Sequence, residues 1–143
     1  MIYLDSSALI KVVLAEPESA ALEAYLARSD GQLASSKLAI TEVHRALFRI
    51  DASQHDCAAA DELLDDLALL PVDDAILRAA AALPGRQVRS LDALHVATAL
   101  GIADHLDVVV TYDKRMTELC VELRLPVHQP GAVPPARQRS GPP

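Results

Sequence analysis

Aromatic residues are scarce in this chain of 143 residues, which contains three tyrosines, one phenylalanine and no tryptophan. Proteins that bind single-stranded nucleic acid by stacking present aromatic side chains to successive bases. We therefore do not expect stacking to dominate any contact of this protein with nucleic acid. Hydrophobic residues nevertheless make up 51% of the chain, so its core must consist mainly of Ala, Leu, Val and Ile.

Cysteine is also rare. Cys57 and Cys120 both lie in stretches that look helical, and their spacing matches no metal-binding motif. We expect both to be reduced residues that pack in the interior. Because no cysteine cluster or paired histidines accompany them, the sequence gives no support for a zinc site.

Long apolar runs are absent as well. No segment reaches the roughly 20 apolar residues that a membrane-spanning helix requires. The N-terminus lacks the basic flank and apolar stretch of a signal peptide, and Asp5 would interrupt such a stretch. We therefore expect a soluble, cytoplasmic protein that makes no membrane contact.

Basic residues are outnumbered by acidic ones, 13 to 20, which gives a formal net charge of −7. This balance argues against binding to nucleic acid through the overall electrostatic field, although it leaves room for local basic patches. A negative chain also suits a site that gathers cations.

Short apolar segments alternate with helical ones along the chain. The expected strands are 2–4, 32–35, 70–72, 108–111 and 126–128. The expected helices are 6–15, 16–30, 37–50, 53–70, 73–83, 90–103 with Ser90 as its N-cap, and 113–125. This alternation predicts one α/β domain over 1–128 with a mostly parallel sheet between helix layers. Residues 129–143 are rich in Pro, Gly and Arg, and we expect a disordered tail there.

Two acidic residues directly follow expected strands. Asp5 comes after the apolar segment 2–4, and Asp113 follows the segment 108–111. Because functional groups in such folds collect beyond the carboxyl ends of parallel strands, both acids should project from the same edge of the sheet. Thr111 could place its hydroxyl against one of these carboxylates.

Two further acids lie on otherwise apolar helical surfaces. Glu42 borders a stripe of Ala and Val, and Asp92 lies in the first turn of the most hydrophobic helix. Converging buried carboxylates repel one another unless a divalent cation neutralises them. The residues therefore favour an acidic metal-binding cluster of Asp5, Glu42, Asp92 and Asp113. Ligation by oxygen alone suits Mg²⁺ or Mn²⁺.

Each acid also has a purely structural interpretation. Asp5 and Asp113 are suitable helix N-caps, and Asp92 favours the positive end of its helix. Glu42 could hold its carboxylate in water at the boundary of the core. Asp73 also follows an expected strand and is interpreted as a cap only, so spacing alone does not decide between the two interpretations.

Four segments of the chain resemble a known family. "YLDSSALIKV", "AITEVHRAL", "SLDALHVATAL" and "VVVTYDKRM" occur in that order and look like the four motifs of PIN-domain ribonucleases. The resemblance is closest to VapC-type toxins of bacterial and archaeal toxin–antitoxin pairs, and it runs from Met1 to about His128. It implies a three-layer α/β/α sandwich around a parallel sheet and an Mg²⁺-dependent endoribonuclease site.

The resemblance also implies roles for individual residues. Its acidic positions correspond to Asp5, Glu42, Asp92 and Asp113, with metal ligation by Asp5, Asp92 and Asp113. Its supporting hydroxyls correspond to Ser6 or Ser7 and to Thr111. His95, three residues after Asp92, is either a packing or supporting residue or a contact to substrate. Candidate contacts to the RNA backbone, which would be surface charges otherwise, are Lys114 and Arg115.

The expected partners also follow from the resemblance. They are an RNA substrate, a cognate VapB-type antitoxin that covers the acidic site, and a second copy of the chain in a homodimer. The alternatives are a non-catalytic PIN-like module that binds RNA or protein, and another PIN nuclease role such as RNA maturation. A phosphate-handling protein of receiver or phosphatase type, with Asp5 or Asp113 as phospho-acceptor, is less favoured because no strand-end lysine or adjacent pair of acids is evident.

Overall fold

A five-stranded parallel sheet forms the centre of the protein in the computed structural model, which describes residues 1–85 and 88–133. Every neighbouring pair of strands runs parallel, in the spatial order β3-β2-β1-β4-β5. The strands are β1 (Ile2–Leu4), β2 (Leu33–Ser36), β3 (Ala68–Leu70), β4 (Val108–Val110) and β5 (Val127–His128).

Helices connect the strands and cover both faces of the sheet. They are α1 (Ser6–Val13), α2 (Ser19–Ala27), α3 (Leu38–Arg49), α4 (Gln54–Asp66), α5 (Asp74–Ala82), α6 (Ser90–Leu100) and α7 (Lys114–Glu122), with a short 3₁₀ helix at Ala103–His105. Within the described part of the chain, none of these helices is long and apolar enough to cross a membrane.

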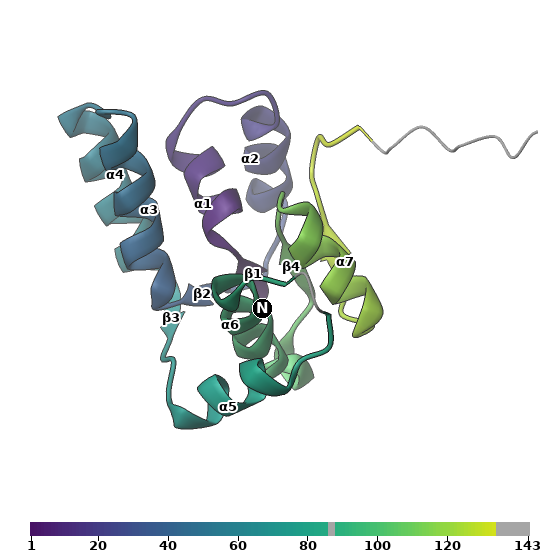
Figure 1. Ribbon diagram of the computed structural model, residues 1–143. Coiled ribbons are helices and arrows are strands. Elements are labelled where there is room, and N and C mark those ends of the chain that lie inside the picture. The colour runs from purple at the N-terminus through teal and green to yellow at the C-terminus, as the bar shows by residue number, and fades with distance from the viewer. Residues whose placement is uncertain (86–87, 134–143) are drawn as a thin grey trace, which may run out of the picture.

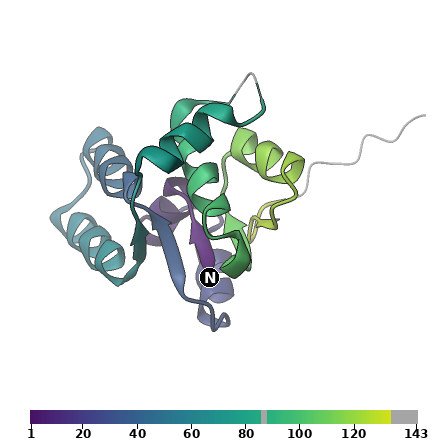
Figure 2. The same ribbon diagram turned by 90° about the horizontal axis from the view of Figure 1, so that it is seen from below.

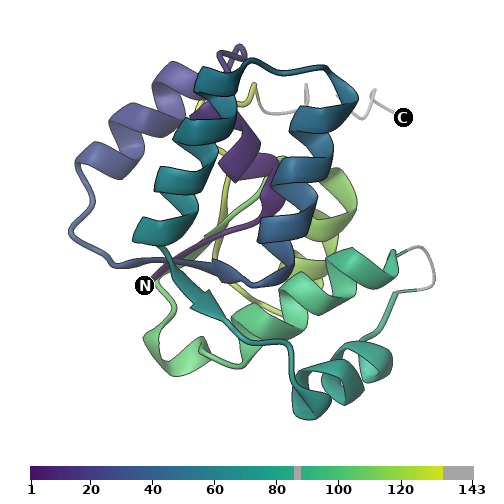
Figure 3. The same cartoon turned by 90° about the vertical axis from the view of Figure 1, so that its left-hand side faces the viewer.

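Alternate residues of the central strands pack into two separate cores, because successive side chains of a strand point to opposite faces. Leu4 and Val110 pack with α1 to α4 on one face. Tyr3 and Val109 pack with α6 and α7 on the other face, while α5 packs against α6. Figure 3 shows α1 to α4 above the strands and α5 and α6 below them. These two cores give the three-layer α/β/α fold expected from the sequence.

The order of the strands places a crossover in the middle of the sheet. From β1 the chain proceeds outward through β2 and β3, and then returns to form β4 and β5 on the opposite side of β1. Figures 1 and 2 show the result, with the α3–α4 pair on one side of the molecule and α7 on the other. In parallel sheets, ligands bind beyond the carboxyl ends of the strands at such a reversal. In this chain that point lies beyond Leu4 and Val110.

Several element boundaries differ from those predicted from sequence, most clearly around β3 and at the start of α6. Helix α4 ends at Asp66 rather than at residue 70, and 68–70 forms β3, whereas the expected strand was 70–72. The apolar periodicity continues past Asp66 without a helix breaker, but pairing with β2 wins over it. Arg89 rather than Ser90 occupies the N-cap position of α6, and Ser90 is the first helical residue.

Residues 129–131 pack against the domain. Pro130 is buried, and Gly131 adopts a φ of +79° where an added Cβ would lie 2.7 Å from the Cβ of Ala21. Only glycine combines that backbone conformation with so close an approach. Residues 134–143, the remainder of the tail expected to be disordered, lie outside the described residues, so that expectation stays a prediction.

Candidate active site

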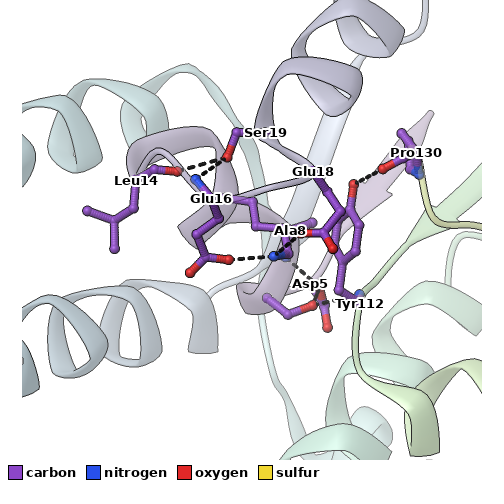
Figure 4. Close-up of polar contacts among 10 residues, drawn as sticks. Asp5, Ala8, Leu14, Glu16, Glu18, Ser19, Tyr112 and Pro130 are labelled. Atoms are coloured by element: carbon purple, nitrogen blue, oxygen red, sulfur yellow. Dashed lines mark hydrogen bonds and ion pairs between the residues drawn. The ribbon is translucent and has the colours of Figure 1, made fainter. Parts of the chain in front are cut away.

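Asp5 lies at the carboxyl end of β1 and caps α1. Its Oδ1 accepts hydrogen bonds from the Ala8 backbone N–H at 2.9 Å and from the Ser7 hydroxyl at 2.6 Å, as Figure 4 shows for Asp5 and Ala8. Its Oδ2 accepts a hydrogen bond from the Thr111 hydroxyl at 2.6 Å. The residue is only 4% exposed, and burial raises the pKa of its carboxyl group although all three hydrogen bonds lower it. Asp5 is therefore both a cap and a buried acid.

The two hydroxyls that bind Asp5 also tie it to the segment after β4. Ser7 Oγ accepts a hydrogen bond from the Tyr112 backbone N–H at 2.8 Å, and Thr111 Oγ1 accepts one from the Asp113 backbone N–H at 3.1 Å. Of the two serines expected to support the site, Ser7 makes this contact. The ends of β1 and β4 are thus held together through polar side chains.

Asp113 and Asp92 lie at the N-terminal ends of the helices that flank this point. Asp113 caps α7 through a hydrogen bond from the Met116 backbone N–H to its Oδ1, at 2.9 Å. Asp92 lies in the first turn of α6, and its Oδ2 is buried without a hydrogen-bond partner. Burial raises the pKa of Asp92, and the neighbouring Asp113 carboxylate raises it further. These two acids therefore repel each other, and the nearby Arg89 lowers the pKa of Asp92 without cancelling the rise.

Glu42 lies on α3 and is bound to a histidine of α6. Its Oε2 lies 2.6 Å from Nε2 of His95 on α6. The other ring nitrogen of His95, Nδ1, lies 2.8 Å from the hydroxyl of Tyr3 on β1. The side chain of His95 is only 3% exposed and that of Glu42 is 20% exposed. His95 therefore lies behind Glu42, with both ring nitrogens engaged inside the protein.

The four predicted acids converge only in part. Asp5 accepts a hydrogen bond from the Thr111 hydroxyl, which in turn accepts one from the backbone N–H of Asp113. Asp113 lies close enough to Asp92 to raise the pKa of Asp92. Yet no group of three or more His, Cys, Asp or Glu side chains in residues 1–85 and 88–133 is arranged to hold a metal ion.

The chemistry of these residues nonetheless fits a divalent cation. The donors are carboxylate oxygens, the ligands that Mg²⁺ and Mn²⁺ prefer. The Asp92 Oδ2 atom is buried and lacks any partner, and a buried carboxylate oxygen without a hydrogen bond is strongly unfavourable unless a cation or proton meets it.

The basic candidates lie on the first turn of α7. Lys114 and Arg115 are both exposed, and the Lys114 ammonium lies 3.8 Å from Glu118 on the same helix. Such an exposed pair is weak. Lys114 and Arg115 are therefore free to meet an anion beside Asp113.

Sequence reasoning missed two residues that support the site. Tyr3 reads as one more apolar strand residue, and only the fold brings its hydroxyl to His95. Gln129 was assigned to the tail, but its side-chain amide donates hydrogen bonds to the Thr111 carbonyl at 2.9 Å and to Thr117 Oγ1 at 3.0 Å.

The segment after β5 is fastened close to this point. The Tyr112 hydroxyl donates a hydrogen bond to the Pro130 carbonyl at 2.7 Å (Figure 4). The Lys11 ammonium lies 4.9 Å from the centre of the Tyr112 ring and pairs with Glu16 and Glu18. We call the edge of the sheet that carries Asp5 and Asp113 the acidic edge. The residues that support it thus include some beyond the last strand.

Comparison with known proteins identifies the family of the chain. Residues 2–122 match the family described as PIN domain. Ribonuclease VapC47 of Mycobacterium tuberculosis is 37% identical over 136 residues, covering 93% of this chain and 99% of that protein. Ribonuclease VapC46 of the same organism is 42% identical over 129 residues, covering 90% of this chain and 97% of that protein.

A solved structure gives the same result for the fold. A chain in a toxin–antitoxin complex from Klebsiella pneumoniae matches with a TM-score of 0.62 and 21% identity, covering 80% of this chain and 89% of that chain. The predicted α/β/α fold and the predicted family are both confirmed. The chain belongs to the PIN-domain family and, within it, to the VapC ribonucleases.

Proposed function

We propose that Asp5, Asp92 and Asp113 hold the divalent cation with which this VapC-type endoribonuclease hydrolyses RNA phosphodiester bonds, and that Glu42 completes the catalytic set. The observation that carries the proposal is the Asp92 carboxylate. Its Oδ2 is buried without a partner, and burial and Asp113 both raise its pKa. A cation between these acids would remove the repulsion between them, and the Asp92 Oδ2 atom would coordinate it. Mg²⁺ suits such a site, and Mn²⁺ is the alternative.

The substrate explains why a cation is needed. A bound divalent cation supplies positive charge next to the anionic phosphodiester and lowers the pKa of a nearby water. The protein fixes the orientation of the acidic side chains that would bind the cation. Asp5 is fixed through both oxygens by Ser7 and Thr111, so little reorganisation is required when the substrate arrives.

Glu42 has a different part in this proposal. Its Oε2 is taken by His95, which leaves Oε1 to accept a hydrogen bond from the water that attacks phosphorus. Lys114 and Arg115, on the first turn of α7, would bind phosphates on either side of the cleaved bond.

The biological setting is also part of the proposal. An active ribonuclease must be restrained in the cell, so we expect a cognate VapB-type antitoxin that covers the acidic edge. The neighbour from Klebsiella pneumoniae was solved as a toxin–antitoxin complex, which supports this expectation. Homodimerisation and a cytoplasmic location stay predictions.

RNA cleavage by the purified, partner-free protein tests the proposal. The wild type is assayed with Mg²⁺, with Mn²⁺ and with EDTA, beside Asp92→Asn and a matched control, Asp74→Asn. Asp74 also lies in the first turn of its helix, but it is exposed on α5. We expect metal-dependent cleavage that Asp92→Asn lowers on the order of 10²- to 10⁴-fold and that Asp74→Asn leaves unchanged. Cleavage that survives EDTA or Asp92→Asn would refute the proposed site.

A further inference from the structure

A chain of hydrogen bonds runs from the interior of the protein to Glu42. The Tyr3 hydroxyl and His95 Nδ1 are 2.8 Å apart, and His95 Nε2 and Glu42 Oε2 are 2.6 Å apart. Tyr3 is fully buried and His95 is 2% exposed. The chain joins β1, α6 and α3, three elements that are distant in sequence.

The chemistry of the three groups fixes the direction of these bonds. An ionised carboxylate only accepts hydrogen bonds, so His95 Nε2 must carry a hydrogen and donate it to Glu42. The pKa of a free phenol is about 10, so the buried Tyr3 hydroxyl carries a hydrogen at neutral pH. In a neutral imidazole Nδ1 then has no hydrogen and accepts the one from Tyr3.

The rings are also fixed by packing. The Tyr3 and His95 rings meet edge to face, with centroids 6.0 Å apart and planes at 76°. Such contacts favour one relative orientation of the two rings. Tyr3 therefore holds His95 on one side. On the other side His95 binds Glu42, whose long side chain would otherwise sample several rotamers.

We infer that His95 is a positioning residue that holds the Glu42 carboxylate in its working orientation, and that Tyr3 in turn holds His95. This inference rests on the proposed function, because it needs Glu42 to act in the reaction. Groups that orient the residues of a metal site act through those residues, and their loss typically lowers activity or metal affinity by about 10- to 100-fold.

The first test removes the histidine and compares two replacements. His95→Leu fills the space without a donor, whereas the His95→Gln amide can still donate to Glu42. We expect His95→Leu to lower kcat by about 10- to 100-fold with little change in KM for RNA, and His95→Gln to recover most of that loss. The control is His44→Leu, because His44 is also a helical histidine bound to an acid, Asp61. It should leave kcat unchanged. Full activity in His95→Leu would overturn the inference.

A double-mutant cycle separates positioning from loss of stability. If His95 acts through Glu42, then His95→Leu should lower kcat by less than about 3-fold in a Glu42→Gln background. If the two losses multiply instead, His95 does not act through Glu42. Thermal unfolding of each variant establishes that it is folded at the assay temperature. Should His95→Leu fail to fold, Tyr3→Phe takes its place in the cycle with the same two outcomes.

A readout without substrate keeps this inference separate from the proposed function. Nitrogen-15 NMR of the metal-free wild type should show His95 with a protonated Nε2 and an unprotonated Nδ1, and Tyr3→Phe should change that signature. The opposite tautomer would overturn the inference even in an active enzyme. A wild type that neither cleaves RNA nor binds Mn²⁺ would instead refute the proposed function and leave the NMR result as the test of the hydrogen-bond chain.

Discussion

Two aspartates in this protein have the same local role in different surroundings. Asp5 follows β1 and caps α1, and Asp73 follows β3 and caps α5. The hydrogen bond from the backbone N–H three residues later is 2.9 Å long in both cases. Within their own helices the two residues are equivalent.

Their neighbourhoods differ. Asp5 is 4% exposed and receives two further hydrogen bonds, from Ser7 and from Thr111, which directly follows the adjacent strand β4. Asp73 is exposed and follows β3, which is one of the two edge strands of the sheet. A capping role therefore does not argue against a functional one. What distinguishes a candidate site residue is burial of its charge beside other acids.

The largest expected effect tests this difference directly. Asn caps helices about as well as Asp, so Asp5→Asn and Asp73→Asn should both preserve their helices. We expect Asp5→Asn to lower metal-dependent RNA cleavage on the order of 10²- to 10⁴-fold, because it removes a proposed ligand charge. Asp73→Asn should cleave at the wild-type rate. Equal losses in the two variants would mean that burial does not identify the site.

Binding of a divalent cation should stabilise the folded protein through the acidic edge. Without metal, the Asp5 carboxylate is buried, and the Asp92 carboxylate is both desolvated and repelled by Asp113. A ligand that binds only the folded state adds about 2.7 kcal/mol to the free energy of unfolding at 100 times its Kd. Thermal unfolding with Mn²⁺ or Mg²⁺, at constant ionic strength, measures the gain. It should disappear in Asp92→Asn and persist in Asp73→Asn. An equal gain in both variants would place the cation elsewhere.

A smaller effect, on the free energy of unfolding, is expected when the exposed helix cap Asp73 is replaced by a residue that cannot cap. Asp73→Ala deletes the acceptor for the Ile76 backbone N–H, and the loss of an N-cap typically lowers the free energy of unfolding by about 0.5–2 kcal/mol. Cleavage at a temperature well below the unfolding midpoint should be unchanged. Chemical denaturation of the variant gives the stability, and a loss of activity in the folded variant would contradict the purely structural role of Asp73.

The same comparison shows what could be predicted from the sequence. The contact between Asp5 and Thr111 spans 106 positions, yet it was predictable because both residues follow apolar strands that are neighbours in a parallel sheet. The contact between Glu42 and His95 spans only 53 positions and was not predicted. It depends on how α3 and α6 cross at the edge of the sheet, which the periodicity of each helix does not fix.

The shifted boundary between α4 and β3 has a related cause. Leu63, Leu64 and Leu67 continue the apolar face of α4 toward the following strand residues, so the local pattern favours a longer helix. In the structure Ala68–Leu70 instead pairs with β2, and this pairing satisfies backbone N–H and C=O groups of both strands. The local sequence pattern contains no information about that partner strand. Local patterns thus placed the strand ends that carry Asp5 and Asp113, but they placed β3 two residues too late.

The smallest expected effect concerns a second histidine–acid pair. On α3, His44 Nδ1 lies 2.6 Å from the Ile40 carbonyl and its Nε2 lies 2.8 Å from Asp61 on α4. Only the protonated imidazolium donates through both nitrogens. The Ile40 carbonyl, and then Asp61, raise the pKa of His44 above its ordinary value of 6.5.

The sign of the pH dependence follows from this shift. Because the folded protein binds the His44 proton more tightly than the unfolded chain does, the stabilisation is fully present below pH 6.5 and is lost as the pH rises through the raised pKa. Both side chains are more than one-third exposed, so we expect only about 0.3–0.5 kcal/mol. Denaturant unfolding of wild type and His44→Gln between pH 5 and 9 measures it. The two curves should differ at low pH and converge at high pH. A difference that persists at high pH would mean that His44 contributes by packing and not by its charge.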